Sequence, residues 1–81
     1  MTLTADSDAK LNEIVRAVLQ LPLDADIRRA SQLSVENWDS LAHVSLILAI
    51  ESEFGVSIDI GDQIGLTSVR AIRLYLEERG V

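Results

Sequence analysis

The sequence predicts an all-α fold, a four-helix bundle of three long helices and one short helix, with a long loop between the first two long helices. Three segments place apolar residues at helical spacing. The apolar residues are almost all aliphatic, with one Phe, one Trp and one Tyr, and the 81 residues include only four Gly and one Pro. These are too few for the many tight turns of a β-sandwich. We expect residues 1–81 to form a single domain, because a chain of this length buries one small core.

The first helix is predicted from one apolar stripe. Its members recur at i, i+3, i+4, i+7 and i+8: Leu11, Ile14, Val15, Val18 and Leu19. Thr4 or Ser7 can cap its start, and Pro22 is expected to stop it near Leu21, because proline lacks a backbone N–H. The segment from Pro22 to Trp38 has no clean period, so we interpret it as a long ordered loop. A loop of this length indicates either a function or a short helix within it.

The second long helix carries two apolar stripes. It is predicted to begin at Asp39 or Ser40, both good cap residues, and to end at Phe54 before Gly55. One stripe is expected to face the core: Leu46, Ile47, Ile50 and Phe54. The other is rotated away from it: Leu41, Val44 and Leu48. A small domain does not bury every side of a helix, so we expect partial exposure of the second stripe, as in an interface. The alternative is a central helix with both stripes buried.

The rest of the chain is predicted to hold a connector, a short helix and a last long helix. Residues 56–60 alternate apolar and polar side chains but have no partner strand, so an extended connector is expected. Residues 59–64 are expected to form one short helical turn ended by Gly65. The last helix follows Thr67 or Ser68 as cap, turns Val69, Ile72 and Leu76 inward, and ends at Gly80.

The composition excludes several classes of site. The chain has no Cys and one His, His43, which excludes a disulfide framework, a cysteine nucleophile and a metal site of thiolates or several histidines. The N-terminal segment from Met1 to Asp6 lacks the basic and apolar regions of a secretory signal, and no apolar run is long enough to span a bilayer. We therefore expect a soluble, cytoplasmic monomer.

The net charge of −6 lies in the middle of the sequence. Residues 30–69 contain six acids and no Lys or Arg, whereas acids and bases balance over the two ends. Such a segment repels nucleic acid and anionic lipid, so neither is expected as a partner, and it attracts basic protein surfaces. The alternative is that the acids only keep a small protein soluble.

Two motifs carry most of the functional information. Trp38-Asp39-Ser40-Leu41 opens the second helix, and Glu51-Ser52-Glu53-Phe54-Gly55-Val56-Ser57-Ile58 closes it. With both motifs at this offset, the chain resembles the acyl carrier protein family over nearly its whole length. The resemblance implies a carrier protein, not an enzyme, with 4′-phosphopantetheine from coenzyme A attached covalently to Ser40.

The resemblance also implies roles for other residues and for partners. A separate phosphopantetheinyl transferase, using Mg²⁺, would modify Ser40, with Asp39 orienting the transferase's metal and capping the helix. Leu41, Val44 and Leu48 would contact partners, with Leu41 beside the prosthetic group, and Glu51 would face basic partners. A loading ligase or transferase would attach an acyl or aminoacyl group as a thioester for downstream biosynthetic enzymes. The N-terminal end of the second long helix also suits a phosphodiester on Ser40, because unpaired backbone N–H groups and the positive end of the helix dipole meet there.

The chain also departs from the family pattern. Ala42, Ser45 and Ser52 stand where members typically carry acids, and Asn37-Trp38 replaces the usual Gly before the Asp-Ser-Leu motif. These departures favour a specialised, free-standing carrier with a dedicated ligase or pathway over one that serves general fatty-acid synthesis. An aminoacyl or peptidyl carrier is one alternative.

Two hypotheses from other classes remain. Asp39, Ser40 and His43 lie within about one helical turn and suggest a hydrolase, but a convex helix surface offers neither an oxyanion hole nor a substrate pocket. In the other hypothesis, the chain is an unmodified acidic helical adaptor that docks through the Leu41, Val44 and Leu48 stripe. For His43 we expect packing at the solvent edge or against the loop, and for Trp38 a place over the core.

Overall fold

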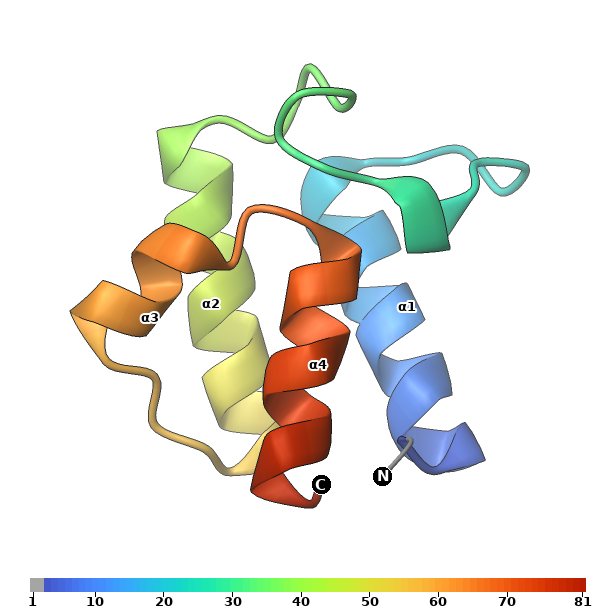
Figure 1. Cartoon of the computed structure of the whole chain (residues 1–81). Helices are drawn as coiled ribbons and strands as arrows, with labels where there is room; N and C mark the ends of the chain where they lie inside the picture. Colours follow the sequence, from blue (N-terminus) through green and yellow to red (C-terminus); the bar gives the residue numbers. More distant parts are fainter. Residues whose placement is uncertain (1–2) are drawn as a thin grey trace.

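The computed structural model describes residues 3–81, so Met1 and Thr2 of the N-terminal segment discussed above lie outside the described residues. Within residues 3–81 it contains α1 (Ala5–Leu19), the 3₁₀ helix η1 (Ile27–Arg29), α2 (Ser40–Phe54), α3 (Ile60–Gly65) and α4 (Val69–Arg79). The predicted fold of three long helices and one short helix is confirmed. Figure 1 shows the long helices grouped into one bundle, with α3 beside α2 and the α1–α2 loop crossing the end at which α2 begins.

The first helix begins as predicted and ends two residues earlier than expected. The Thr4 hydroxyl accepts a hydrogen bond from the Ser7 N–H at 3.1 Å. Leu19 is the last helical residue, because Gln20 adopts the left-handed conformation with φ of 54° and returns its N–H to the Arg16 carbonyl. A left-handed residue closes a helix without help from a proline. The chain therefore leaves α1 before it reaches Pro22.

The loop between α1 and α2 is tied to the rest of the fold at several points. It contains η1, the short helix that its length suggested, with Ile27 buried. Its backbone bonds to the start of α4: the Val69 N–H donates to the Ala30 carbonyl at 3.0 Å, and the Gln32 N–H donates to the Thr67 carbonyl at 2.9 Å. These bonds fix the path of the loop across the bundle.

The two faces of α2 differ in burial as the sequence predicts. Leu46, Ile47 and Ile50 are buried, and Phe54, expected with them, is only partly buried against the core. Leu41, Val44 and Leu48 are 77%, 53% and 59% exposed. The alternative with both stripes buried is therefore wrong. Gly55 ends the helix in the left-handed conformation, with φ of 65°.

The second half of the chain completes the core. Residues 56–59 form an extended connector without a strand partner, as predicted. The Ser68 hydroxyl accepts from the Ala71 N–H and caps α4, which buries Val69, Ile72 and Leu76 and ends at Gly80. The buried residues of α2 and α4 form one cluster with three buried residues of α1: Leu11, Val15 and Leu19. None of the helices in residues 3–81 combines the length and apolar character needed to cross a bilayer.

The division of α2 into two faces predicts the effect of truncating its side chains. Ile50 is fully buried, so Ile50→Ala should lower the free energy of unfolding by about 2–5 kcal/mol, through lost burial and the cavity left behind. Val44→Ala, on the exposed face, should change it by less than about 0.5 kcal/mol. Urea unfolding followed by circular dichroism measures both, and a near-neutral Ile50→Ala would mean that the faces are assigned wrongly.

Candidate functional site

The corner at which the loop enters α2 presents Ser40 to solvent. Asp39 is the N-cap, and its carboxylate accepts a hydrogen bond from the Ala42 N–H at 2.8 Å while its carbonyl accepts from the His43 N–H at 2.9 Å. Ser40 is the first helical residue and is exposed. Among residues 3–81, the N–H groups of Ser40 and Leu41 have no backbone or side-chain acceptor. An exposed hydroxyl therefore stands beside two unpaired donors at the positive end of a helix dipole.

The surface next to this corner is open. A hollow of about 270 Å³ adjoins the head of α2, and its lining consists of Val18, Gln20, Asn37, Asp39, Leu41, Ala42 and Ser45. A group attached to the Ser40 oxygen has room to leave the surface without displacing a core side chain. The corner therefore fits a long, flexible prosthetic group.

Trp38 and His43, which flank Ser40 in the sequence, contact each other. The Trp38 indole N–H donates to His43 Nδ1 at 3.0 Å, and His43 Nε2 lies 2.8 Å from the Gln63 carbonyl of α3. Trp38 is only 3% exposed and covers the core, and His43 packs against the loop, as predicted. Both imidazole nitrogens already have partners, so neither is free to take a proton from Ser40. The geometry argues against the hydrolase hypothesis.

Exposed apolar side chains lie on α3 as well as on α2. The predicted stripe of Leu41, Val44 and Leu48 on α2 is exposed, and so are Ile60 and Ile64 on α3, at 76% and 73%. We call these five residues the α2–α3 apolar surface. Sequence reasoning missed the two isoleucines. The available signal was an i, i+4 apolar pair on a six-residue helix, too short to bury much; α3 has no buried residue at all.

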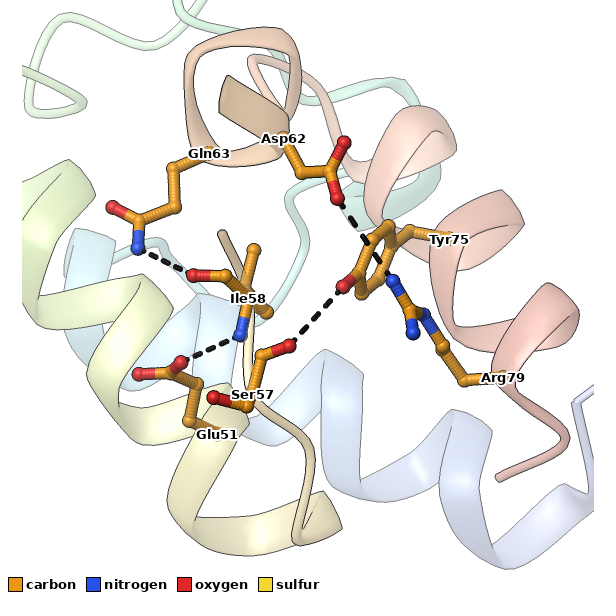
Figure 2. A network of polar contacts seen from close by, with 7 residues as sticks. All are labelled: Glu51, Ser57, Ile58, Asp62, Gln63, Tyr75 and Arg79. Carbon is orange, nitrogen blue, oxygen red and sulfur yellow. Dashed lines mark hydrogen bonds and ion pairs between the residues drawn. The ribbon is translucent and has the colours of Figure 1, made fainter. Parts of the chain in front are cut away.

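Glu51 has a contact inside the protein that the sequence did not reveal. Its carboxylate accepts a hydrogen bond from the Ile58 N–H at 2.7 Å, and the Gln63 side chain donates to the Ile58 carbonyl at 2.8 Å. Figure 2 shows these two bonds on either side of Ile58, together with the Arg79–Asp62 ion pair and the Tyr75–Ser57 hydrogen bond. Glu51 thus ties the end of α2 to the connector, and its contact with partners stays a prediction.

Two of the acids in residues 30–69 form ion pairs, and the others do not. Glu53 lies 3.6 Å from Lys10, and Asp62 lies 3.9 Å from Arg79. Within the described part of the chain, Glu36, Asp39, Glu51 and Asp59 form no ion pair. Glu51 is partly buried and bonded to Ile58, so the three exposed carboxylates, Glu36, Asp39 and Asp59, are the most available to a basic protein surface.

Lys10 has a pKa that departs clearly from its ordinary value. The hydrogen bond that Lys10 donates to the Asp6 carboxylate and the negative charge of Asp6, with a smaller contribution from Glu53, raise the pKa of Lys10. A raised lysine pKa stabilises the fold at all pH values below about 10, and the gain disappears only as the lysine deprotonates in alkali. Lys10 therefore adds no pH dependence near neutrality.

Comparison of the sequence with known proteins assigns the chain to a family. The family model described as "Phosphopantetheine attachment site" matches residues 9–76. The chain belongs to this family. It is a carrier protein of the phosphopantetheine-attachment type rather than an enzyme, and its prosthetic group is covalently attached 4′-phosphopantetheine.

Relatives of the carrier protein include plant acyl carrier proteins. Acyl carrier protein 4, chloroplastic, of Arabidopsis thaliana is 27% identical over 91% of this chain and 54% of its own length. Acyl carrier proteins 4 and 3, chloroplastic, of Cuphea lanceolata are 37% and 38% identical over 63% and 58% of this chain, and 37% and 33% of their own lengths. The carrier protein thus spans about half of these relatives or less. Their names state a chloroplast location, and the cytoplasmic location expected here stays a prediction.

The contact of Glu51 with the connector predicts a stability effect. Glu51→Ala leaves the Ile58 N–H without its acceptor and should lower the free energy of unfolding by about 1–3 kcal/mol. Glu51→Gln keeps an acceptor oxygen and should lose less. Glu53→Ala removes only an exposed ion pair and should cost less than about 1 kcal/mol. If thermal unfolding shows equal, small losses for Glu51→Ala and Glu53→Ala, the Ile58 contact contributes nothing.

Proposed function

We propose that Ser40 is the residue that carries 4′-phosphopantetheine and that the carrier protein presents acyl groups to partner enzymes as thioesters of that group. One observation carries this proposal: Ser40 is an exposed hydroxyl at the head of α2, beside the unpaired N–H groups of Ser40 and Leu41. Those groups and the positive end of the α2 dipole stabilise the negative charge of a phosphodiester on the Ser40 oxygen.

The other serines within the matched residues suit this role less well. The hydroxyls of Ser31 and Ser34 bond to each other and to neighbouring N–H groups, and the Ser68 hydroxyl caps α4. The remaining three serines lie beyond the first turn of α2 or in the connector: Ser45, Ser52 and Ser57. Ser40 alone among these seven combines exposure, a hydroxyl without a hydrogen bond and a place at the start of a helix.

The residues around Ser40 have separate tasks in this proposal. Bound 4′-phosphopantetheine supplies a thiol, which the Cys-free chain lacks, and a thiol holds acyl groups as thioesters. Asp39 holds the helix start in place through its bond to Ala42 and leaves its second carboxylate oxygen for the metal of the modifying transferase. Ser40 is exposed, so an arm on its oxygen has room to swing toward a partner.

Carrier proteins of this family work with phosphopantetheinyl transferases and biosynthetic enzymes. In this chain we assign their recognition to the α2–α3 apolar surface, with Glu36, Asp39 and Asp59 attracting basic residues around it. Glu51 keeps a smaller part, because one of its oxygens is already engaged by Ile58. The relatives are named acyl carrier proteins, which favours an acyl cargo over an aminoacyl one.

Intact mass spectrometry tests the attachment. The carrier protein incubated with coenzyme A, Mg²⁺ and a broad-specificity phosphopantetheinyl transferase should gain one phosphopantetheinyl group. Ser40→Ala should gain none, because it lacks the attacking oxygen, and Ser45→Ala, one turn further along α2, should gain one. An unmodified wild-type chain would favour the adaptor hypothesis instead, and a modified Ser40→Ala would move the attachment to another residue.

A further inference from the structure

The side chains of Trp38 and His43 meet across the corner that presents Ser40. Trp38 precedes Ser40 by two residues and His43 follows it by three. Along the 3.0 Å hydrogen bond from the indole N–H to Nδ1 the two rings lie edge to edge, with centroids 6.2 Å apart and planes at 27°. We call this contact the Trp38–His43 clamp. It closes a loop of chain around Asp39 and Ser40 that the backbone alone would leave free to fray.

The two partners of His43 dictate one form of its ring. An indole N–H only donates, so Nδ1 must accept and carries no proton. A backbone carbonyl only accepts, so Nε2 must carry the proton that it shares with the Gln63 oxygen, 2.8 Å away. The neutral Nε2–H tautomer satisfies both contacts. The protonated imidazolium has a hydrogen on each nitrogen and cannot accept from Trp38.

The clamp connects parts of the fold that otherwise have few bonds to one another. On the loop side, the Asn37 amide donates to the Leu19 carbonyl at the end of α1, and the Trp38 N–H donates to the Val35 carbonyl. On the other side, the bond from His43 to Gln63 is the only hydrogen bond between α2 and α3 within residues 3–81. One imidazole therefore links the loop, the first turn of α2 and α3.

We propose that His43, as the neutral Nε2–H tautomer, is a positioning residue for the modification of Ser40. This inference rests on the proposed attachment at Ser40. A transferase must bind the Ser40 hydroxyl and the Asp39 carboxylate in one fixed relative position. The clamp holds the two side chains in that position before the transferase binds, so the complex loses less conformational entropy when it forms. Protonation of His43 breaks the clamp and releases the corner.

Nitrogen NMR tests the tautomer directly. The chain has a single His, so the imidazole ¹⁵N signals need no assignment by mutation. At pH 7.5 they should show an unprotonated Nδ1 and a protonated Nε2. Trp38→Phe, which removes the indole donor, should weaken this preference without abolishing it, because Nε2 still donates to the Gln63 carbonyl. An Nδ1–H tautomer, or an even mixture in the wild type, would overturn the clamp whether or not Ser40 is modified.

Transfer kinetics test the positioning role. With coenzyme A and one transferase, His43→Leu and Trp38→Phe should each lower kcat/KM for modification roughly tenfold, because the corner loses its preorganisation. His43→Asn keeps an acceptor near the Nδ1 position and does not titrate, so it should restore most of the rate. Circular dichroism at the assay temperature checks that each variant is folded.

The outcomes separate this inference from the proposed function. If His43→Leu and Trp38→Phe are folded and modified as fast as the wild type, His43 has no positioning role although Ser40 still carries the group. If the wild type is not modified at all, the attachment at Ser40 fails and the positioning role fails with it. In that case the nitrogen shifts still decide whether the clamp exists.

Discussion

One hydrogen bond, from the Ala42 N–H to the Asp39 carboxylate, sets the residue at which α2 begins. Both Asp39 and Ser40 are good N-cap residues, and a helix uses only one. If Ser40 were the cap, its hydroxyl would be engaged with a backbone N–H of the first turn. Because Asp39 takes that position, the Ser40 hydroxyl stays free and becomes the first side chain of the helix. Asp39 therefore holds the start of the helix, and Ser40 is left to offer its oxygen for modification.

The limited size of the domain explains why α2 both builds the core and exposes apolar side chains. Leu46, Ile47 and Ile50 are buried with residues of α1 and α4, but no element within residues 3–81 covers the face that holds Leu41, Val44 and Leu48. The short helix α3 adds two exposed isoleucines and buries none of its own residues. Side-chain bonds from His43, Glu51 and Arg79 hold it and its connector in place instead. An element held by few bonds and little burial opens at a low free-energy cost.

The sequence predicted the features that depend on neighbouring residues. The caps at Thr4 and Ser68 and the glycine ends of α2 and α4 follow from local backbone chemistry, and the two faces of α2 follow from spacing. The contacts of Glu51 and His43 were not predictable, because they reach backbone groups 7 and 20 residues away. Every residue has the same backbone carbonyl, and nearly every residue has the same backbone N–H, so the sequence does not indicate which backbone group a side chain will contact. The exposure of α3 likewise depends on what packs beside it.

The central claim, that Ser40 bears the prosthetic group, is tested most directly by locating the modification within the chain. Residues 30–69 contain no Lys or Arg, so trypsin releases residues 30–70 of the modified protein as one peptide. Fragmentation of that peptide by tandem mass spectrometry should place the phosphopantetheinyl group on Ser40. A modified peptide whose fragments carry the group on Ser45, Ser52 or any other residue would contradict the account.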